Sequence, residues 1–432
     1  MSRSYFIATL GCKLNQFDSA DVEGRLQAGG FRRTGSPATA DIVVVNTCTV
    51  TASADAQSRR LARRLRRESP DCTLIVMGCS TQLDPAAIES ATRVDRTFGT
   101  GSGEGVARFA LDRFGDTSSL ARENSCAAQE FPIPSFPERT RAFLKVQEGC
   151  DLRCSYCIIP AVRGNSRSLP PAEIARQVLQ LVETGYREIV LTGVNTGDYG
   201  KDLSPPTTLL ALLRRLTVIP GLGRIRLNSL EPCTIDPGLI AFLADTERVA
   251  PHLQIPIQSG SDRILAAMRR PYKLSRYARV VETLRNRIPA IALGADVIAG
   301  FPGEGEEEFR QTREFLADSP LNYLHVFPYS ERPGTPAAAL DGKVAGPVKS
   351  DRARALRTLG DRLNFQFRSR FLGKTRTVLV LGAQRPDGRW RALSDNYIEM
   401  GVRGDAALVN RLLPARLADV TQSDTLADIA AS

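Results

Sequence analysis

Three cysteines near the middle of this 432-residue chain lie close together in the sequence, as Cys150, Cys154 and Cys157. Thiolates spaced Cys-x3-Cys-x2-Cys can occupy three corners of one 4Fe–4S cluster from a single loop. The fourth iron then has no protein ligand, which is what a cluster needs if it is to bind and reduce a small molecule. A structural zinc site is the alternative, but it requires four ligands, and the chain has only two histidines and no fourth cysteine close by. The spacing therefore favours an iron–sulfur cluster over zinc.

A second set of cysteines follows three apolar, β-prone runs near the N-terminus. The runs are Tyr5–Leu10, Ala40–Val45 and Thr73–Met77, and the cysteines after them are Cys12, Cys48 and Cys79. Amphipathic helical stretches, expected at about Ser19–Ala28 and Ala52–Arg67, separate the runs, which indicates a parallel sheet with helices on its faces. Ligands of such sheets bind beyond the carboxyl ends of the strands, so the three cysteines are expected to converge on one place. They are either the three ligands of a second cluster with one open iron, or cysteines buried in a core.

The other three cysteines are expected to be structural. Cys72 begins a strand-like run, Cys126 lies in a Pro-rich stretch and Cys233 follows a proline. The chain has nine cysteines, an odd number, and most lie far apart, which is not the pattern of a disulfide framework. Metal or redox roles are therefore the leading explanation for the cysteines that share a pattern.

The composition predicts a cytosolic protein with a polyanionic partner. The formal charge of +10 favours attraction to a nucleic acid or another polyanion. No apolar run reaches the roughly 18 residues of a transmembrane helix, and the N-terminus lacks the apolar segment of a signal peptide. The length indicates about two to four domains. With two histidines, the chain is poorly provided for conventional imidazole acid–base catalysis.

From about residue 141 the alternation of strand-like and helical segments resumes, after a linker expected at 116–140. The six strands are expected at Ala142–Val146, Glu188–Leu191, Arg224–Leu227, His252–Ile255, Ala292–Ile298 and Tyr323–Phe327. Six βα units without a clear seventh predict an open, partial (β/α)6 barrel, whose active site lies at the carboxyl ends of the strands. The candidates there, besides Tyr156 of the cysteine loop, are Gly193, Asn195, Ser229, Glu231, Gln258, Ser259 and Gly300. Amides of the Gly-rich turns can reach a carboxylate or a ribose, and Glu231 and Gln258 can bind an ammonium group or hydroxyls.

The C-terminal region predicts a small all-β barrel, a fold that often binds RNA. Four short strands are expected after a basic helical segment, at Thr375–Leu381, Arg389–Leu393, Tyr397–Gly401 and Ala415–Val420. A capping domain without a ligand of its own is the alternative. An earlier basic helix either meets a phosphate backbone or forms a solvated face, and it carries Arg59, Arg60, Arg63, Arg64, Arg66 and Arg67. The candidate RNA contacts are Arg59, Arg63, Arg163 and Arg167.

Taken together, the two cysteine sets and the order of the parts resemble the methylthiotransferases of the radical S-adenosylmethionine (SAM) enzymes. The resemblance covers nearly the whole chain and implies an N-terminal domain at 1–115, a radical SAM core at 141–371 and a TRAM-like domain at 372–432. Several stretches look most like the branch that modifies N6-threonylcarbamoyladenosine in tRNA. They are Leu10–Asn15, Cys154–Pro160 with Arg163-Gly164, Arg167-Ser168, and His325–Ser330 with Arg332, Gly334 and Thr335. One departure is Leu169, where members often have an arginine.

The resemblance implies a division of labour between the two cysteine sets. The cluster on Cys150, Cys154 and Cys157 binds SAM and yields a 5′-deoxyadenosyl radical, which takes hydrogen from C2 of the modified adenosine at position 37, beside the anticodon. The cluster on Cys12, Cys48 and Cys79 supplies sulfur, methylated by a second SAM. The implied partners are the tRNA anticodon stem-loop, an electron donor such as flavodoxin or ferredoxin, and a sulfur donor. The strand-end residues named above are then contacts of SAM.

Two other functions stay open on sequence alone. The first is a sister enzyme acting on isopentenyladenosine in tRNA or on an aspartate of a ribosomal protein, and the basic charge favours RNA over protein. The second is a non-catalytic RNA-binding protein whose cysteines hold structural metal. This second alternative leaves the glutamate and the glycine-rich loops at the strand ends unexplained.

Overall fold

The computed structural model describes residues 3–114 and 140–430, which form two compact units. The first unit contains the described residues up to 114 together with Cys157–Asn165, and the second contains 140–156 and 166–430. The division therefore falls inside the segment that carries the central cysteines. The linker expected at 116–140, apart from its last residue, and Cys126 lie outside the described residues.

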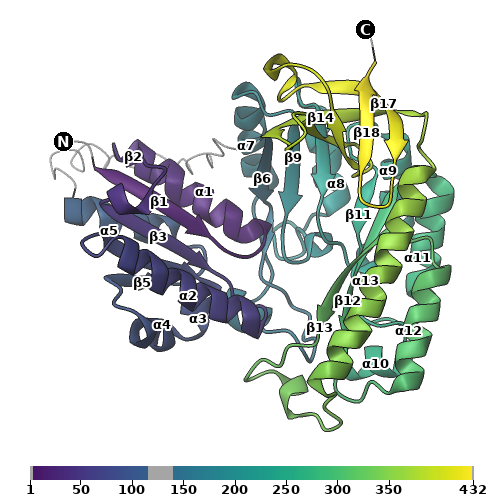
Figure 1. Cartoon of the computed structure of the whole chain (residues 1–432), viewed down its shortest axis with the longest axis horizontal. Helices are drawn as coiled ribbons and strands as arrows, with labels where there is room; N and C mark the ends of the chain where they lie inside the picture. The colour runs from purple at the N-terminus through teal and green to yellow at the C-terminus, as the bar shows by residue number, and fades with distance from the viewer. Residues whose placement is uncertain (1–2, 115–139, 431–432) are drawn as a thin grey trace. The chain divides into compact units, whose positions relative to one another are not determined.

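The first unit is built on a five-stranded parallel sheet in the order β2-β1-β3-β4-β5 (Figure 1). Its strands are β1 (Ser4–Thr9), β2 (Arg32–Arg33), β3 (Ile42–Thr47), β4 (Thr73–Gly78) and β5 (Arg96–Phe98). Helices α1 (Lys13–Ala28) and α5 (Gly103–Phe114) pack on one face, and α2 (Ala52–Glu68) and α4 (Pro85–Ala91) pack on the other. Strands β3 and β4 are buried along their whole length because helices cover both faces of the sheet.

Two features of this unit differ from the prediction. The edge strands β2 and β5 are only two and three residues long, so the sequence shows no alternating apolar pattern at these positions. Helix α1 begins at Lys13, directly after Cys12, rather than at Ser19. Its first turns bury the polar residues Asn15 and Asp18 together with Leu14 and Phe17, which obscures the usual apolar stripe of a helix.

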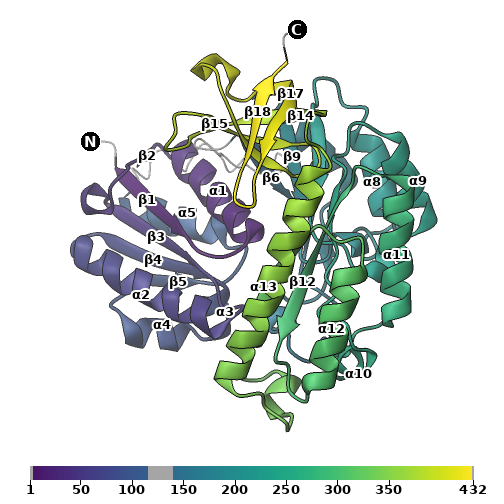
Figure 2. The same ribbon diagram turned by 45° about the vertical axis from the view of Figure 1, so that its right-hand side comes forward.

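The second unit begins with six parallel strands arranged as two three-stranded sheets, β10-β9-β6 and β11-β12-β13. They are β6 (Arg141–Lys145), β9 (Glu188–Thr192), β10 (Arg224–Leu227), β11 (His252–Gln254), β12 (Ala292–Ala299) and β13 (Tyr323–Pro328). The bridge between Ile225 and Val249 links the two sheets. The longer helices between strands are α7 (Pro171–Glu183), labelled in Figure 1, and α8 (Leu209–Leu216), α9 (Pro237–Asp245), α11 (Leu274–Arg287) and α12 (Glu306–Asp318), labelled in Figure 2. All six strands occur where the sequence predicted them.

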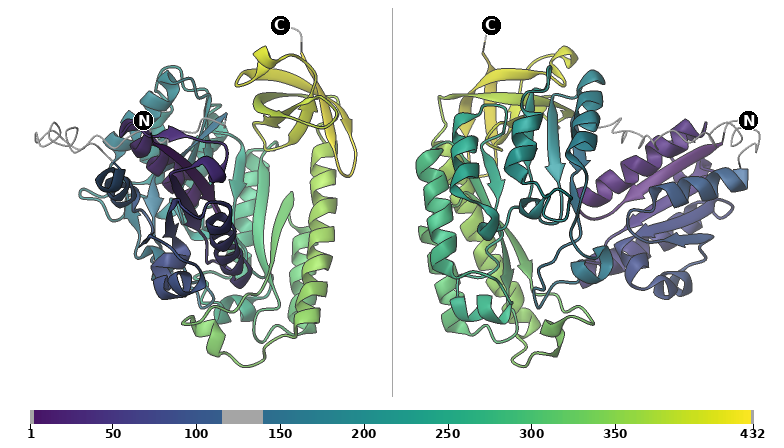
Figure 3. Two further views of the ribbon diagram at one scale, coloured as in Figure 1. Left: turned by 60° about the vertical axis from the view of Figure 1, so that its left-hand side comes forward. Right: turned by 180° about the vertical axis from the view of Figure 1, so that it is seen from behind.

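Helix α13 (Gly346–Ser369) runs along the sheet β11-β12-β13 and leads into a closed barrel (Figure 3). Gly360 allows the close approach of the helix, because a Cβ there would lie 3.1 Å from the Cβ of Leu324. The barrel order is β14-β15-β16-β18-β17, with β14 (Thr375–Gln384), β15 (Trp390–Ser394), β16 (Glu399–Val402), β17 (Leu412–Val420) and β18 (Thr425–Ile429). The sequence predicted four of these strands. Strand β18, which closes the barrel, was not predicted because its Thr-Leu-Ala-Asp-Ile sequence has little apolar alternation.

A buried cluster of charges fixes this C-terminal barrel to the central one. Arg224 and Arg226 of β10 flank Glu188 of β9, and all three side chains are almost completely inaccessible. Arg224 donates to the carbonyl of Thr377 (3.1 Å), and Arg226 donates to that of Ser394 (3.0 Å). Burial alone would raise the pKa of Glu188, but the two guanidinium groups lower it far below its usual range. The two barrels of the second unit are therefore joined by ion pairs and main-chain hydrogen bonds. Among the described residues, no helix is long and apolar enough to cross a membrane.

Candidate active site

The first unit brings Cys12, Cys48 and Cys79 to one edge of its sheet. Strands β1, β3 and β4 are neighbours in register, and the three cysteines follow their carboxyl ends. Cys12 precedes α1, and Cys79 opens the short helix α3 (Cys79–Leu83). Gly11, at φ +101°, permits the approach, because a Cβ on it would lie 2.8 Å from the Cβ of Cys48. The convergence that the strand ends predicted is present.

The buried thiol of this first site ionises less readily than a free thiol. Burial raises the pKa of Cys79 to about 12, the guanidinium of Arg163 opposes the rise, and the Cys12 and Cys48 thiols add to it. A metal ligand must be the thiolate, so binding of a cluster here would be coupled to the release of protons. No three His, Cys, Asp or Glu side chains among the described residues are gathered tightly enough for a single metal ion. A cluster does not need that spacing, because each cysteine binds a different iron.

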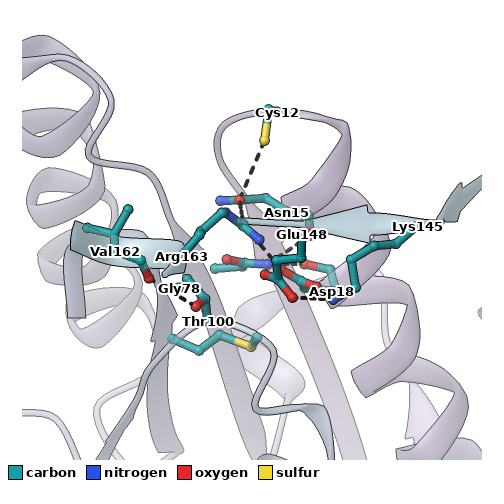
Figure 4. Close-up of polar contacts among 12 residues, drawn as sticks. Cys12, Asn15, Asp18, Gly78, Thr100, Lys145, Glu148, Val162 and Arg163 are labelled. Carbon is teal, nitrogen blue, oxygen red and sulfur yellow. Dashed lines mark hydrogen bonds and ion pairs between the residues drawn. The ribbon is translucent and has the colours of Figure 1, made fainter. Parts of the chain in front are cut away.

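A buried arginine lies near Cys12 (Figure 4). Arg163, at the end of α6 (Ile159–Arg163), donates to Asn15 Oδ1 at 2.7 Å and pairs with Asp18 at 3.3 Å. Asn15 in turn donates to the carbonyls of Leu10 (2.8 Å) and Thr47 (2.7 Å), which lie at the ends of β1 and β3. The arginine therefore holds the two strand ends that precede Cys12 and Cys48.

The segment that follows the central cysteines is part of the first unit. Ile158 and Val162 pack against Cys79, and the hydroxyl of Thr100 donates to the carbonyl of Val162 (3.2 Å). Arg163 was predicted as an RNA contact, but its side chain is 1% exposed and is engaged inside the unit. Its position is that of a structural cation and not of an RNA contact.

In the second unit, Gln147 organises the start of the cysteine loop. Its Oε1 accepts hydrogen bonds from the amides of Val194 (2.9 Å) and Asn195 (3.0 Å), and its Nε2 donates to the carbonyl of Gly149 (2.7 Å). Gly193 lies against the same side chain, since a Cβ there would be 2.8 Å from Gln147 Oε1. One buried amide thus ties the loop before Cys150 to the end of strand β9. Gln147 is not among the predicted site residues, although a glutamine three residues before a metal motif is a usable signal.

A second buried arginine, also missed, lies at Cys154. Arg270 donates to Cys154 Sγ at 3.3 Å and forms a buried ion pair with Glu231. Burial opposes the charge of Arg270, but the carboxylate of Glu231 more than compensates and raises its pKa. Burial also raises the pKa of the Cys150 thiol, to about 11. Arg270 follows another arginine in the sequence, and nothing local distinguishes it from a surface residue.

The other predicted SAM contacts lie at strand ends of the second unit. Asn195 is buried, and its Oδ1 has no hydrogen-bond partner, which leaves an acceptor for a ligand. Gln258 has a positive φ of 67°, and its backbone pairs with β12. Gly300, also at positive φ, donates its amide to Glu304 (2.8 Å). The remaining positions are the carbonyl of Ser229, which accepts from Thr196, the buried Ser259, and Tyr156, which packs beside Phe301. These groups suit a ligand with hydroxyl, ammonium and carboxylate functions.

The candidate RNA contacts differ in exposure. Arg63 and Arg167 are exposed, whereas Arg59 is partly buried and paired with Asp55 of its own helix. Cys72 is buried in the core beneath α2 and Cys233 is exposed, which agrees with a structural role for the first.

Comparison with known proteins decides the family. Residues 144–316 match the Radical SAM superfamily, and residues 4–99 match Uncharacterized protein family UPF0004. "Threonylcarbamoyladenosine tRNA methylthiotransferase MtaB" of Bacillus subtilis (strain 168) is 36% identical over 95% of this chain and 92% of its own length. The chain belongs to the radical SAM tRNA methylthiotransferases. Membership of the Radical SAM superfamily implies SAM and a 4Fe–4S cluster, for which the cysteine loop and the strand-end groups provide suitable ligands.

Two further comparisons bear on substrate and fold. A relative from Thermobifida fusca (strain YX), named "tRNA-2-methylthio-N(6)-dimethylallyladenosine synthase", is 36% identical over 91% of this chain and 81% of its own length. The solved radical SAM methyltransferase TsrM from Kitasatospora setae, with cobalamin and a [4Fe-4S] cluster bound, superposes with a TM-score of 0.57. It covers 78% of this chain and 77% of its own at 16% identity, so it supports the fold alone.

Proposed function

We propose that this enzyme methylthiolates C2 of N6-threonylcarbamoyladenosine at position 37 of tRNA, with two 4Fe–4S clusters and two molecules of SAM. The observation that carries the proposal is the convergence of Cys12, Cys48 and Cys79 at one sheet edge, separate in sequence from the Cys150–Cys157 loop. One cysteine set is enough to generate a radical. Insertion of sulfur into an unactivated C–H bond also needs a sulfur source, and the second set provides a place for it.

The reaction replaces the C2–H bond of the adenine by a C2–S bond. When bound, the cofactors supply a 5′-deoxyadenosyl radical that takes the hydrogen atom, a sulfur atom, and a methyl group from the second SAM. The protein's own contribution is to hold these groups. Arg270 donates to Cys154 Sγ, Gln147 fixes the preceding loop, and Arg163 with Asn15 fixes the strand ends at the second set.

The identity of the modified adenosine is inferred from the branch of the family that the chain resembles. Relatives named for threonylcarbamoyladenosine and for dimethylallyladenosine are similar to this chain at 34–37% identity, so identity alone does not separate them. The stretches Leu10–Asn15 and His325–Ser330 resemble the threonylcarbamoyladenosine branch and favour that base. We further propose the domain boundaries at 115, 141 and 371, an anticodon stem-loop bound with the help of Arg59, Arg63 and Arg167, and external donors of electrons and sulfur.

Mass spectrometry of nucleosides from a strain that lacks this protein tests the proposal. We expect 2-methylthio-N6-threonylcarbamoyladenosine to disappear and its unmethylthiolated precursor to accumulate. Re-expression of the wild-type chain should restore it, and a chain with Cys12→Ala should not. Loss of the isopentenyl analogue instead would assign the sister activity, and unchanged tRNA would contradict the proposal.

A further inference from the structure

The sheet β11-β12-β13 has one face covered by α13 and an opposite face that carries an unusual set of side chains. On β13, Leu324 points to Gly360 of α13, so its neighbour His325 and, two residues on, Phe327 belong to the opposite face. Asp296 of β12 pairs in register with His325. The side chain of His325 is 52% exposed, and Phe327 is the one exposed aromatic residue in the described part of the chain. An exposed phenylalanine beside an acid and a histidine is typical of a ligand-binding surface.

A hydrogen-bond network beneath this face holds His325 and Asp296 in place. Tyr323 donates its hydroxyl hydrogen to Gln254 Oε1 (2.6 Å), so the 2.7 Å contact with His252 Nε2 must use a hydrogen on the histidine. The amide nitrogen of Gln254 then faces Asp296 Oδ1 (2.7 Å) and His325 Nδ1 (3.2 Å) and donates to both. When Nδ1 of His325 accepts this hydrogen, the neutral ring carries its own hydrogen on Nε2.

The network leaves one donor and one acceptor side by side. The side-chain hydrogen bonds of His325 use Nδ1, and those of Asp296 use Oδ1, which lies 3.2 Å from that nitrogen. With the ring hydrogen on Nε2, this N–H of His325 and the Oδ2 atom of Asp296 remain for a ligand. Together they match a planar group that offers an acceptor next to a donor, with Phe327 available for its flat face.

The pair is held rigidly from below. The ring of Tyr323 lies where a side chain on Gly294 would be, since a Cβ there would come within 2.0 Å of Tyr323 Cζ. His252 stacks on Tyr397 of the C-terminal barrel, with ring centroids 4.0 Å apart. A pre-organised polar pair of this kind costs little ordering entropy when a ligand binds.

The pair also lies beside the strand ends that are expected to bind SAM. Gln258 donates its backbone amide to the carbonyl of Asp296 at 2.8 Å. Along β12, Asp296 is followed at two residues by Ile298 and at four by Gly300. Ile298 and Tyr156 of the cysteine loop both pack against the same buried cluster, which includes Phe301. A group bound at Asp296 is therefore one layer of side chains below the carboxyl ends of the barrel.

We propose that Asp296, His325 and Phe327 bind the target adenine base of the RNA. Asp296 Oδ2 accepts from the N6–H of the base, His325 Nε2–H donates to N7, and Phe327 stacks on the ring. Unpaired bases are recognised in this way, by aromatic stacking and by hydrogen bonds to one edge. Binding through N6 and N7 places the N6 substituent on the N1 side and leaves C2 uncovered for the reaction. This inference rests on the proposed function.

The test uses the reconstituted full-length enzyme and two synthetic anticodon stem-loops. One stem-loop carries N6-threonylcarbamoyladenosine at position 37, and the other carries its 7-deaza analogue, in which a C–H replaces N7. With the wild-type enzyme we expect the analogue to lower kcat/KM for methylthiolation by about tenfold, the value of one hydrogen bond. His325→Phe should show a similar loss on the ordinary stem-loop and no further loss on the analogue.

Matched variants separate recognition from folding. His325→Gln keeps an N–H donor and should recover most of the activity. Phe327→Ala should lower kcat/KM for methylthiolation, whereas Phe327→Trp, which keeps an aromatic ring for stacking, should not. Leu372→Ala, an exposed change outside this face, should behave as wild type. Each variant should melt as wild type does, and Leu372→Ala should also cleave SAM in the absence of RNA at the wild-type rate.

The outcomes distinguish this site from the proposed function. Equal turnover of both stem-loops by the wild-type enzyme overturns the base site. Weaker SAM binding by His325→Phe overturns it as well and assigns the pair to the adenine of SAM. If the wild-type enzyme acts only on an isopentenyl stem-loop, the substrate proposal fails, and the 7-deaza comparison on that stem-loop still decides the site. If it acts on no RNA, both proposals fall.

Discussion

The two cysteine sites of this enzyme are built in opposite ways. Cys150 and Cys154 lie in one loop, and the chain itself keeps them close to Cys157. Cys12, Cys48 and Cys79 lie more than thirty residues apart and are brought together by three adjacent parallel strands. The first arrangement is local and can be recognised from spacing, whereas the second depends on the register of a sheet.

The two sites share one feature that neither motif shows. Each unit places a buried arginine beside a cysteine, Arg163 near Cys79 and Arg270 at Cys154, and each arginine is paired with a buried carboxylate. A cation beside a thiolate stabilises the ionised ligand, and a carboxylate partner reduces the cost of burying that cation. Both cysteine sites therefore have a cation beside a thiol, although different parts of the chain supply it.

Separate removal of the two cysteine sets should have the largest effects. Changing Cys150, Cys154 and Cys157 to alanine should abolish reductive cleavage of SAM, because the open iron needs all three thiolates in place. Changing Cys12, Cys48 and Cys79 should leave that cleavage intact and abolish methylthiolation. Formation of 5′-deoxyadenosine and of modified nucleoside, measured in the same reaction, checks both. Cys233→Ala serves as a control, and loss of both activities in the folded N-terminal variant would count against separate roles.

Iron content should distinguish the sites quantitatively. Anaerobic reconstitution should give about eight irons per chain in the wild-type enzyme and about four in either triple variant, as expected for two four-iron clusters. Iron and sulfide analysis with Mössbauer spectroscopy provides the measurement. A wild-type value of about four would leave only one of the two sites with a cluster, and a preparation dominated by zinc would contradict the two-cluster proposal altogether.

Arg163→Met should destabilise the N-terminal unit although no cysteine is replaced. The change leaves Asp18 buried without its cation, and breaking a buried pair in this way costs about 3–5 kcal/mol. Chemical denaturation followed by circular dichroism should show the loss. Arg167→Met is the matched control, because Arg167 is exposed only four residues away, and we expect a change of about 0.5 kcal/mol or less there. Equal behaviour of the two variants would show that Arg163 is not a structural cation.

The smallest effect concerns the pH dependence of Cys79 in the metal-free protein. Its pKa of about 12 keeps the thiol protonated at neutral pH, so alkylation of Cys79 should be slow and should accelerate as the pH rises toward that value. A raised thiol pKa also stabilises the fold below the unfolded pKa, about 9, and this contribution is lost as the pH rises through about 12. Mass spectrometry of alkylated peptides between pH 7 and 10 measures the rate. Rapid labelling of Cys79 at pH 7, compared with exposed Cys233, would contradict the expectation.

Much of the architecture can be predicted from the sequence because strongly periodic elements are recognisable from their apolar residues. The six strands of the central barrel, and the cysteines after β1, β3 and β4, could be located from apolar runs and their ends. The edge strands β2 and β5 and the closing strand β18 could not, because short or weakly apolar strands are defined by their partners rather than by their own residues.

What the sequence alone determined is the chemistry that the cysteines can support and the order of the parts that position them. The tertiary structure decided which other side chains serve those sites. Arg270 reaches Cys154 across 116 residues, and Arg163 reaches Asn15 across 148. A spacing rule cannot predict such pairs, since an arginine looks the same in the sequence whether it ends in solvent or beside a buried thiol. Only the packing of distant segments, which excludes water, turns these arginines into partners of the cysteines.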